Sequence, residues 1–232
     1  MNKKEKYEAL CEEVRNCTTC MNINFAPHIE NSNCFIHDEL VNGETYVNRW
    51  NLIQGSLDAE IMVIGQDYGC YDEKYFVTDA TLQKLFNDVF EINIKEKNEK
   101  LYFTNMANCY RKNKSTGAIN TGCLALCTNK FMSRLINIIS PKAIVVLGSE
   151  AFKALACCDK AKLVCKNPDK NNAPYNFKTI MEHKYSLVFE DNHEIAVFPV
   201  YHPGSNGRIN RSYDMQKEDW TKVRKYIEGE NI

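Results

Sequence analysis

Short apolar runs alternate along the chain with segments of helical periodicity. The apolar runs predict buried strands at 60–65, 101–104, 143–147 and 194–200. Apolar positions three and four residues apart predict helices at 4–16, 78–91, 121–139, 149–158 and 214–228. This alternation is typical of an α/β fold, a three-layer domain with a four-stranded, mainly parallel central sheet flanked by helices. Pro141 should stop the third helix, and Ser149 should cap the fourth.

Two segments lie outside this alternation. Residues 21–56 are polar and irregular and predict a long loop with short strands near 46–50. Residues 159–184, rich in Lys, Asn, Asp and Pro, read as an excursion from the fold, and a hairpin is expected to join 185–190 to the last strand. The chain has 232 residues, and we expect 1–232 to form a single domain.

Polar side chains follow three of the predicted strands at their carboxyl ends, namely Asp67, Asn105 and His202. Parallel strands end at the same edge of a sheet, where open α/β sheets bind ligands. A carboxylate there can orient water, an amide offers a donor and an acceptor to a base edge, and an imidazole can donate to an anion that develops on a substrate. Taken singly, Asp67 is explained equally well as a turn residue, and an ordinary role in a cap or a solvated loop is the commoner explanation for Asn105 and for His202.

The loop after His202 is basic and polar, and its Arg208 and Arg211 are candidate phosphate contacts. Aromatic residues after Asp67, among them Tyr68 and Phe76, can stack on a base or pack the turn against the sheet. The formal net charge is −1, which excludes a global basic field, so any nucleic-acid surface must be local.

The chain contains 11 cysteines, an odd number, and no signal peptide or apolar stretch of membrane-spanning length is visible. We therefore expect a cytoplasmic protein without membrane contact, in which thiolates bind metal or lie in the core. Cys17 and Cys20 have the spacing of two ligands to one metal centre, and Cys109 with Cys123 or Cys127 would complete a four-thiolate site. This spacing suits zinc and an iron–sulfur cluster equally.

Together these motifs resemble the uracil-DNA glycosylase superfamily, specifically its iron–sulfur branch, family 4 and its relatives. The matching pieces, in chain order, are Cys17-x-x-Cys20, Ile64-Gly65-Gln66-Asp67-Tyr68-Gly69, Tyr102-Phe103-Thr104-Asn105, Cys109-Tyr110-Arg111, Cys127, Pro141 through Gly148, and Val200-Tyr201-His202-Pro203.

The resemblance implies removal of uracil, or a related damaged base, from DNA by a protein we expect to be a monomer. It implies a [4Fe–4S] cluster on Cys17, Cys20, Cys109 and Cys127, with zinc as the lesser alternative. Asp67 would orient water and stabilise the sugar cation, and His202 would stabilise the leaving base. The base would be held by the motif residues Gly65, Gln66, Tyr68, Phe76 and Asn105. Phosphates would be bound by Arg208 and Arg211, and Ile209 is a candidate wedge into the base stack.

The chain departs from the iron–sulfur branch at Gly65-Gln66-Asp67-Tyr68-Gly69, where that branch typically carries Gly-Glu-Ala-Pro-Gly. The Gln-Asp pair is more similar to the cluster-free family 1 motif Gly-Gln-Asp-Pro-Tyr, in which the Asp aligns or activates water. Gly204 replaces the Ser expected after His-Pro. These departures bear on the base that is removed, so a glycosylase for another deaminated or modified base is an alternative. A non-catalytic nucleic-acid-binding protein with a cluster is another.

Overall fold

The computed structural model describes residues 1–19, 29–33, 39–40, 46–49, 52–67, 77–96, 98–111, 121–167 and 176–230.

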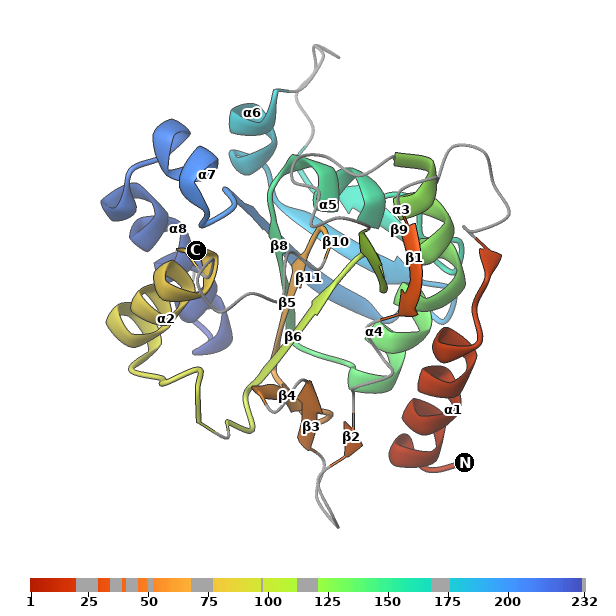
Figure 1. Ribbon diagram of the computed structural model, residues 1–232. Helices are drawn as coiled ribbons and strands as arrows, with labels where there is room; N and C mark the ends of the chain where they lie inside the picture. The colour runs from red at the N-terminus through yellow and green to blue at the C-terminus, as the bar shows by residue number, and fades with distance from the viewer. Residues whose placement is uncertain are drawn as a thin grey trace.

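Within these ranges, nine strands form one mixed sheet through the centre of the molecule (Figure 1). In spatial order the strands are β2 (Glu39–Leu40), β3 (Tyr46–Arg49), β4 (Leu52–Ser56), β6 (Leu101–Asn105), β5 (Ile61–Gly65), β8 (Ala143–Leu147), β11 (Glu194–Val200), β10 (Tyr185–Phe189) and β9 (Ala161–Cys165). The central strands β6, β5, β8 and β11 pair in parallel, and the outer strands pair antiparallel. A separate two-stranded sheet pairs β1 (Ile29–Asn33) with β7 (Cys109–Arg111).

The α/β class is confirmed, but the predicted sheet of four strands is too small. The four predicted strands form only the parallel centre. The segment 21–56, expected as a loop with short strands near 46–50, contributes β2, β3 and β4 to one edge. At the other edge, β9 lies within the expected excursion 159–184 and extends the sheet. These edge strands lack long apolar runs because they do not lie between two layers of helices.

Helices cover both faces of the sheet (Figure 1). One face is covered by α1 (Lys3–Arg15), α3 (Thr121–Cys127), α4 (Ser133–Ile139) and α5 (Ser149–Leu155). The other is covered by α2 (Val77–Phe90) and α8 (Tyr213–Ile227). Two short helices, α6 (Phe177–Met181) and α7 (Ser205–Asn210), complete the set within the described ranges.

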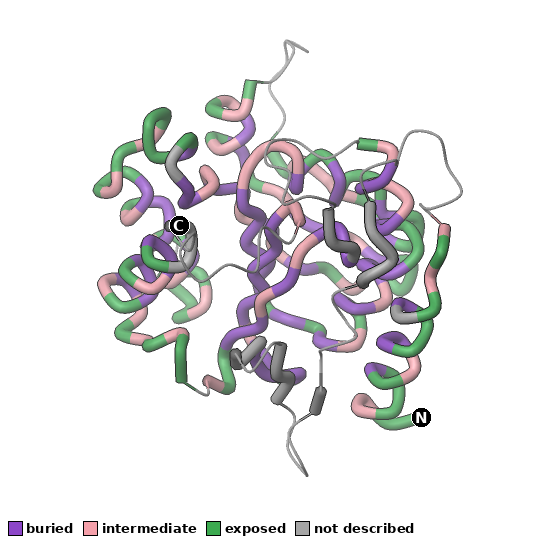
Figure 2. The backbone as a smooth tube through the Cα atoms, viewed as in Figure 1, coloured by how far each residue is buried: buried purple, intermediate pink, exposed green. Residues whose placement is uncertain are grey.

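Burial on both faces explains the continuous apolar runs of the central strands. All five residues of β5 are buried, as are all five of β8 (Figure 2). Successive side chains of β5 point to opposite faces, so Met62 and Ile64 join the core under α1 and α4, whereas Ile61 and Val63 join the core under α2 and α8.

The helix predicted over 121–139 contains a π-helical turn, η5 (Thr128–Met132), between α3 and α4. Such turns occur often at functional sites, and this one directly follows Cys127. The prediction that Ser149 caps this helix is wrong, because Gly148 occupies the N-cap position and Ser149 is the first residue of α5.

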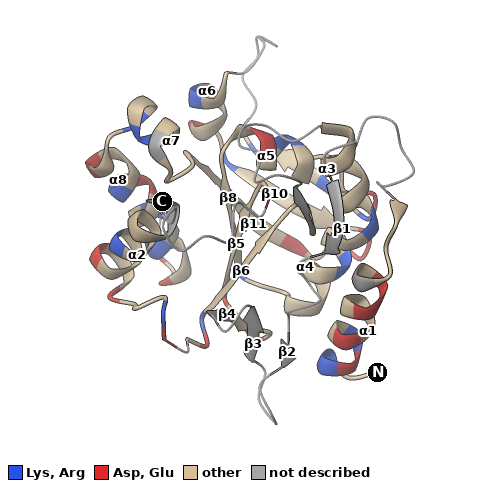
Figure 3. Cartoon of the chain, viewed as in Figure 1, with Lys and Arg blue, Asp and Glu red and all other residues tan. Residues whose placement is uncertain are grey.

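Charged residues of both signs lie along the helices, while the central strands contain almost none (Figure 3). None of the helices in the described part of the chain is long and apolar enough to span a bilayer.

Candidate active site

The carboxyl ends of the four central strands lie at one edge of the sheet. Parallel pairing aligns Gly65 at the end of β5 with Asn105 at the end of β6, and Leu147 of β8 with Val200 of β11. The residues that follow these strands therefore share this edge, as the order of strands and helices predicted.

A glycine at the end of β5 makes room for Asn105. A Cβ built on Gly65 would lie 2.2 Å from Oδ1 of Asn105, so the Asn105 side chain lies directly over this glycine. Two backbone hydrogen bonds join the following turns: Met106 N–H donates to the Gly65 carbonyl over 2.9 Å, and Ala107 N–H donates to the Gln66 carbonyl over 3.0 Å. The Asn105 amide is therefore held beside the turn that carries Asp67.

The carboxylate of Asp67 accepts a hydrogen bond from its neighbour. Gln66 Nε2 donates to Asp67 Oδ1 over 2.9 Å, and both residues are partly exposed. A carboxylate accepts hydrogen bonds at both oxygens, so Asp67 can bind a water at this edge while Gln66 orients it.

His202 presents a neutral imidazole with its proton on Nε2. The Gly204 backbone N–H donates to Nδ1 over 3.0 Å, and because an amide N–H is always a donor, Nδ1 must be unprotonated. Burial lowers the pKa of His202 below its ordinary value, which keeps the ring neutral near pH 7. The proton is then on Nε2, which is able to donate to an acceptor.

Gly148 ends β8, the strand between β5 and β11. Its φ of +89° is in the region that favours glycine, and a Cβ here would lie 3.5 Å from His202 Cβ. Gly148 thus lets the chain turn beside His202 directly after β8.

A family model described as "Uracil DNA glycosylase superfamily" matches residues 52–225, which run from β4 into α8 and include every residue of this edge. The chain belongs to the uracil DNA glycosylase superfamily. No curated protein matches the chain. Membership in this superfamily suggests DNA glycosylase activity.

In this superfamily member, α7 packs against the backbone of His202. A Cβ on Gly207 would lie 1.7 Å from the His202 carbonyl oxygen and 2.8 Å from its carbonyl carbon. A larger residue at position 207 would therefore displace either the helix or the histidine segment.

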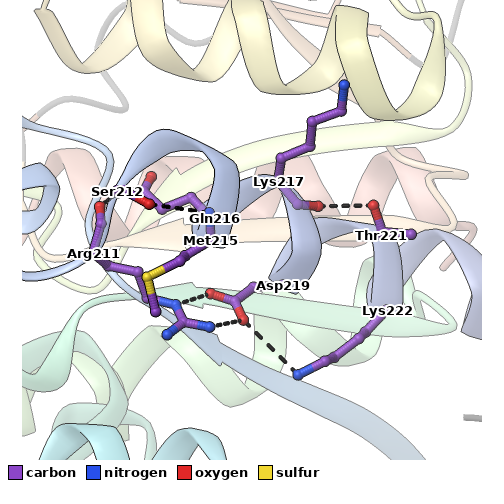
Figure 4. Close-up of polar contacts among 8 residues, drawn as sticks. All are labelled: Arg211, Ser212, Met215, Gln216, Lys217, Asp219, Thr221 and Lys222. Atoms are coloured by element: carbon purple, nitrogen blue, oxygen red, sulfur yellow. Dashed lines mark hydrogen bonds and ion pairs between the residues drawn. The ribbon is translucent and has the colours of Figure 1, made fainter.

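The candidate DNA-contacting residues of α7 differ in their surroundings. Ile209 is 82% exposed, an unusual position for an isoleucine, and Arg208 is exposed beside it. Arg211, which follows α7, instead forms a bidentate ion pair with Asp219 of α8, and the two side chains are only 16% and 5% exposed (Figure 4). Its assignment as a phosphate contact stays a prediction.

Two of the predicted cluster ligands can be placed. Cys17 Sγ lies 3.3 Å from Thr19 Oγ1 and 3.5 Å from Lys130 Nζ, and Lys130 belongs to the π turn that follows Cys127. Burial, the largest influence, raises the pKa of Cys17, but the Thr19 hydrogen bonds and the Lys130 charge outweigh it and leave that pKa below its ordinary value.

Cys127 is buried and accepts hydrogen bonds from Asn108. The Asn108 backbone N–H lies 3.4 Å from Cys127 Sγ, and its side-chain Nδ2 lies 3.9 Å away. Because Asn108 precedes Cys109, the segments carrying Cys17, Cys109 and Cys127 adjoin one another. The rival ligand, Cys123, is also buried, one turn earlier on α3.

Several predicted residues lie outside the described part of the chain. They are Cys20, Tyr68, Phe76 and the side chain of Cys109. Among the described residues, no three His, Cys, Asp or Glu side chains form a metal-binding group. This finding leaves the four-cysteine prediction open, since two of its members are not among those residues.

The sequence reasoning missed Asp219 and Gln216 of α8. Both are buried and both contact Arg211. A signal was present, because Gln216 and Asp219 fall on the same helical stripe as the fully buried Trp220 and Val223. Polar residues on an apolar stripe indicate a specific buried partner.

Proposed function

We propose that this protein is a DNA glycosylase that hydrolyses the N-glycosidic bond of uracil in DNA. The observation that carries the proposal is the neutral His202, protonated on Nε2, at the same sheet edge as Asn105 and Asp67. The reaction needs a carboxylate, a group that recognises the base edge and a hydrogen-bond donor to the leaving base, and this edge carries Asp67, Asn105 and His202.

Breaking the bond leaves negative charge on the base and positive charge on the sugar. His202 Nε2–H donates to the base oxygen on which negative charge grows, and a neutral donor suits this role because it does not protonate the base outright. Asp67 stabilises the sugar cation and orients the attacking water. Asn105 pairs its amide with the edge of uracil, and Phe76 with Tyr68 is proposed to stack on or border the ring.

A base inside a duplex must leave the stack before it reaches this edge. Ile209 is the proposed wedge, since it is an exposed apolar side chain on the helix whose Gly207 packs against the His202 backbone, and such a side chain can enter the gap that the base leaves. Arg208, exposed on the same helix, is proposed to bind a backbone phosphate.

We also propose that Cys17, Cys20, Cys109 and Cys127 hold a [4Fe–4S] cluster. The two of these cysteines whose side chains are described support this proposal: the pKa of Cys17 is lowered and Cys127 receives N–H donors, two conditions that favour thiolate ligands. The cluster would join the amino-terminal segment to β7 and α3, and the chemistry of base release is left to the residues of the sheet edge.

The test is base release from oligonucleotides carrying a single uracil, hypoxanthine or xanthine, single- and double-stranded, followed by alkaline cleavage at abasic sites. We expect strand scission with uracil. Release of only hypoxanthine or xanthine would show that the substrate is another deaminated base and not uracil. Binding to DNA without release of any base would support the non-catalytic alternative.

Substitutions at the two catalytic positions refine this test. Asp67→Asn and His202→Ala should each lower single-turnover base release by about 10²-fold or more. Cys157→Ser, at an exposed cysteine that follows the carboxyl end of α5, is the control and should retain full activity. Full activity of the Asp67 or His202 variant would remove that residue from the mechanism.

A further inference from the structure

Both the side chain and the backbone of Arg211 bond to residues of α8 (Figure 4). Its guanidinium donates from Nε and Nη2 to the two carboxylate oxygens of Asp219, over 2.7 Å for the Nη2 contact. Its backbone carbonyl accepts a hydrogen bond from Gln216 Nε2 over 3.1 Å. A second cation, Lys222, lies 3.9 Å from Asp219 but is mostly exposed.

The same residue is attached to α7 and, through it, to His202. The Arg211 backbone N–H donates to the Gly207 carbonyl over 2.9 Å. Gly207 in turn contacts the His202 carbonyl so closely that no Cβ fits between them. A continuous series of contacts thus leads from Asp219 through Arg211 and Gly207 to the backbone of His202, which carries the imidazole.

This geometry argues against a phosphate contact by Arg211. Turning the guanidinium toward DNA would leave Asp219, which is 5% exposed, as a buried carboxylate without its bidentate partner. Arg208, three residues earlier, is exposed and better placed for DNA.

We propose that Arg211 is a positioning residue whose bidentate pairing with Asp219 fixes α7 on α8, and thereby sets the position of His202 and of Ile209. The expected effect on base release rests on the proposed glycosylase function. The expected effect on the position of α7 and His202 does not.

The two roles for Arg211 predict opposite effects of changing Asp219. If Arg211 were a phosphate contact, Asp219→Asn would release it and strengthen DNA binding, and Arg211→Lys would keep the charge and most of the activity. If Arg211 is a positioning residue, both substitutions should lower single-turnover base release at saturating DNA by about 10-fold or more. The reason is that the rate of the chemical step falls steeply when a catalytic group is misplaced.

Salt dependence separates Arg208, in α7, from Arg211, which follows that helix. Arg208→Gln should reduce the slope of log Kd against log salt by about 1, the value for one lost phosphate contact, whereas Arg211→Gln should leave the slope unchanged. A reduced slope for Arg211→Gln, or undiminished base release by Asp219→Asn, would overturn the proposal.

Stability needs separate control, since each single variant leaves one charge without its partner. The double variant Arg211→Gln/Asp219→Asn has no unpaired charge at this position, and we expect it to melt closer to the wild type than either single variant while still releasing base slowly. Arg134→Gln breaks a matched bidentate pair, with Glu13, between α4 and α1, and should leave base release unchanged. Recovery of full activity by the double variant would contradict positioning.

A measurement independent of activity distinguishes this inference from the proposed function. Nitrogen-15 NMR of the imidazole, assigned with His202→Gln, should show a protonated Nε2 and an unprotonated Nδ1 in the wild type. In Asp219→Asn and Arg211→Lys, the chemical shifts of the two ring nitrogens should move toward each other, because the ring then exchanges between its two neutral tautomers. If the wild type releases no base, the proposed function fails, while unchanged signals in these variants would defeat the positioning role.

Discussion

One backbone N–H determines which ring nitrogen of His202 carries the proton. The Gly204 amide occupies Nδ1, so the ring can take up a second proton only by losing that hydrogen bond, and burial opposes the resulting charge. The residue that sets the tautomer of this histidine, Gly204, is therefore two positions away in sequence and belongs to its own loop.

The lowered pKa of His202 links stability to pH. In the unfolded chain the ring has its ordinary pKa of 6.5, so between that value and the lower folded value the unfolded state binds more protons. We expect this contribution to the free energy of unfolding to be complete above pH 6.5 and to be lost as the pH falls through the folded pKa. Urea unfolding of the wild type and His202→Gln, at about pH 7.5 and about pH 5.5, measures it. An equal loss of stability in both proteins would contradict the expectation.

Gly65 acts at the same scale, through Asn105. Gly65→Ala places a methyl group where the Asn105 amide oxygen lies, and because that oxygen ends a flexible side chain, we expect the amide to move and stability to change by less than about 1 kcal/mol. Base release should fall by about 10-fold or more. The control is Asn105→Ala with and without Gly65→Ala. If Gly65 acts only through Asn105, the double variant is no slower than Asn105→Ala.

At the scale of elements, α7 is too short to be stable alone and depends on its neighbours. It is held by the contact of Gly207 with His202 on one side and by Arg211 with α8 on the other. The helix α8 is in turn joined to α2 by Tyr213, whose hydroxyl donates to Asp88 over 2.8 Å. The position of the basic loop is thus set by helices on one face of the sheet.

Replacing Gly207 tests this dependence. Gly207→Ala puts a methyl group against backbone atoms that cannot turn aside, so we expect a loss of stability of about 1–3 kcal/mol together with slower base release. Asn206→Ala, at the exposed position next to it, should leave the melting temperature unchanged. A Gly207→Ala protein as stable as the wild type would show that α7 does not rest on His202 in this way.

At the scale of the whole molecule, the proposed cluster connects segments distant in sequence. Cys17 follows α1, and Cys127 ends α3 on the same face of the sheet. Protein purified without oxygen should contain about four iron atoms per chain and absorb visible light, and removal of the iron should lower the melting temperature.

Matched substitutions locate the ligands of this cluster. Cys17→Ser and Cys127→Ser should lose iron, whereas Cys157→Ser and Cys123→Ser should retain it. Zinc in place of iron would favour the alternative metal, and iron retained by Cys127→Ser but lost by Cys123→Ser would exchange the two assignments.

The sequence by itself determined the parallel centre of the sheet and the edge that carries Asp67, Asn105 and His202. Strands buried between two layers of helices must be apolar throughout, and the residues after them must share an edge once the strands are parallel. Periodicity is a local property, so it sufficed for α1, α2, α8 and the four central strands. It indicated β3 but failed for β2 and β4 at the same edge, because their pairing depends on partners rather than on their own pattern.

Only the tertiary structure decided what each polar residue contacts. The proton on Nε2 of His202, the place of Asn105 over Gly65, and the pairing of Arg211 with Asp219 all depend on approaches across turns or between helices. Arg208 and Arg211 are the same residue type only three positions apart, yet Arg208 is exposed and Arg211 is paired with a buried carboxylate. Residue type defines what a side chain can bind, but its partner is set by which elements the fold brings within hydrogen-bonding distance.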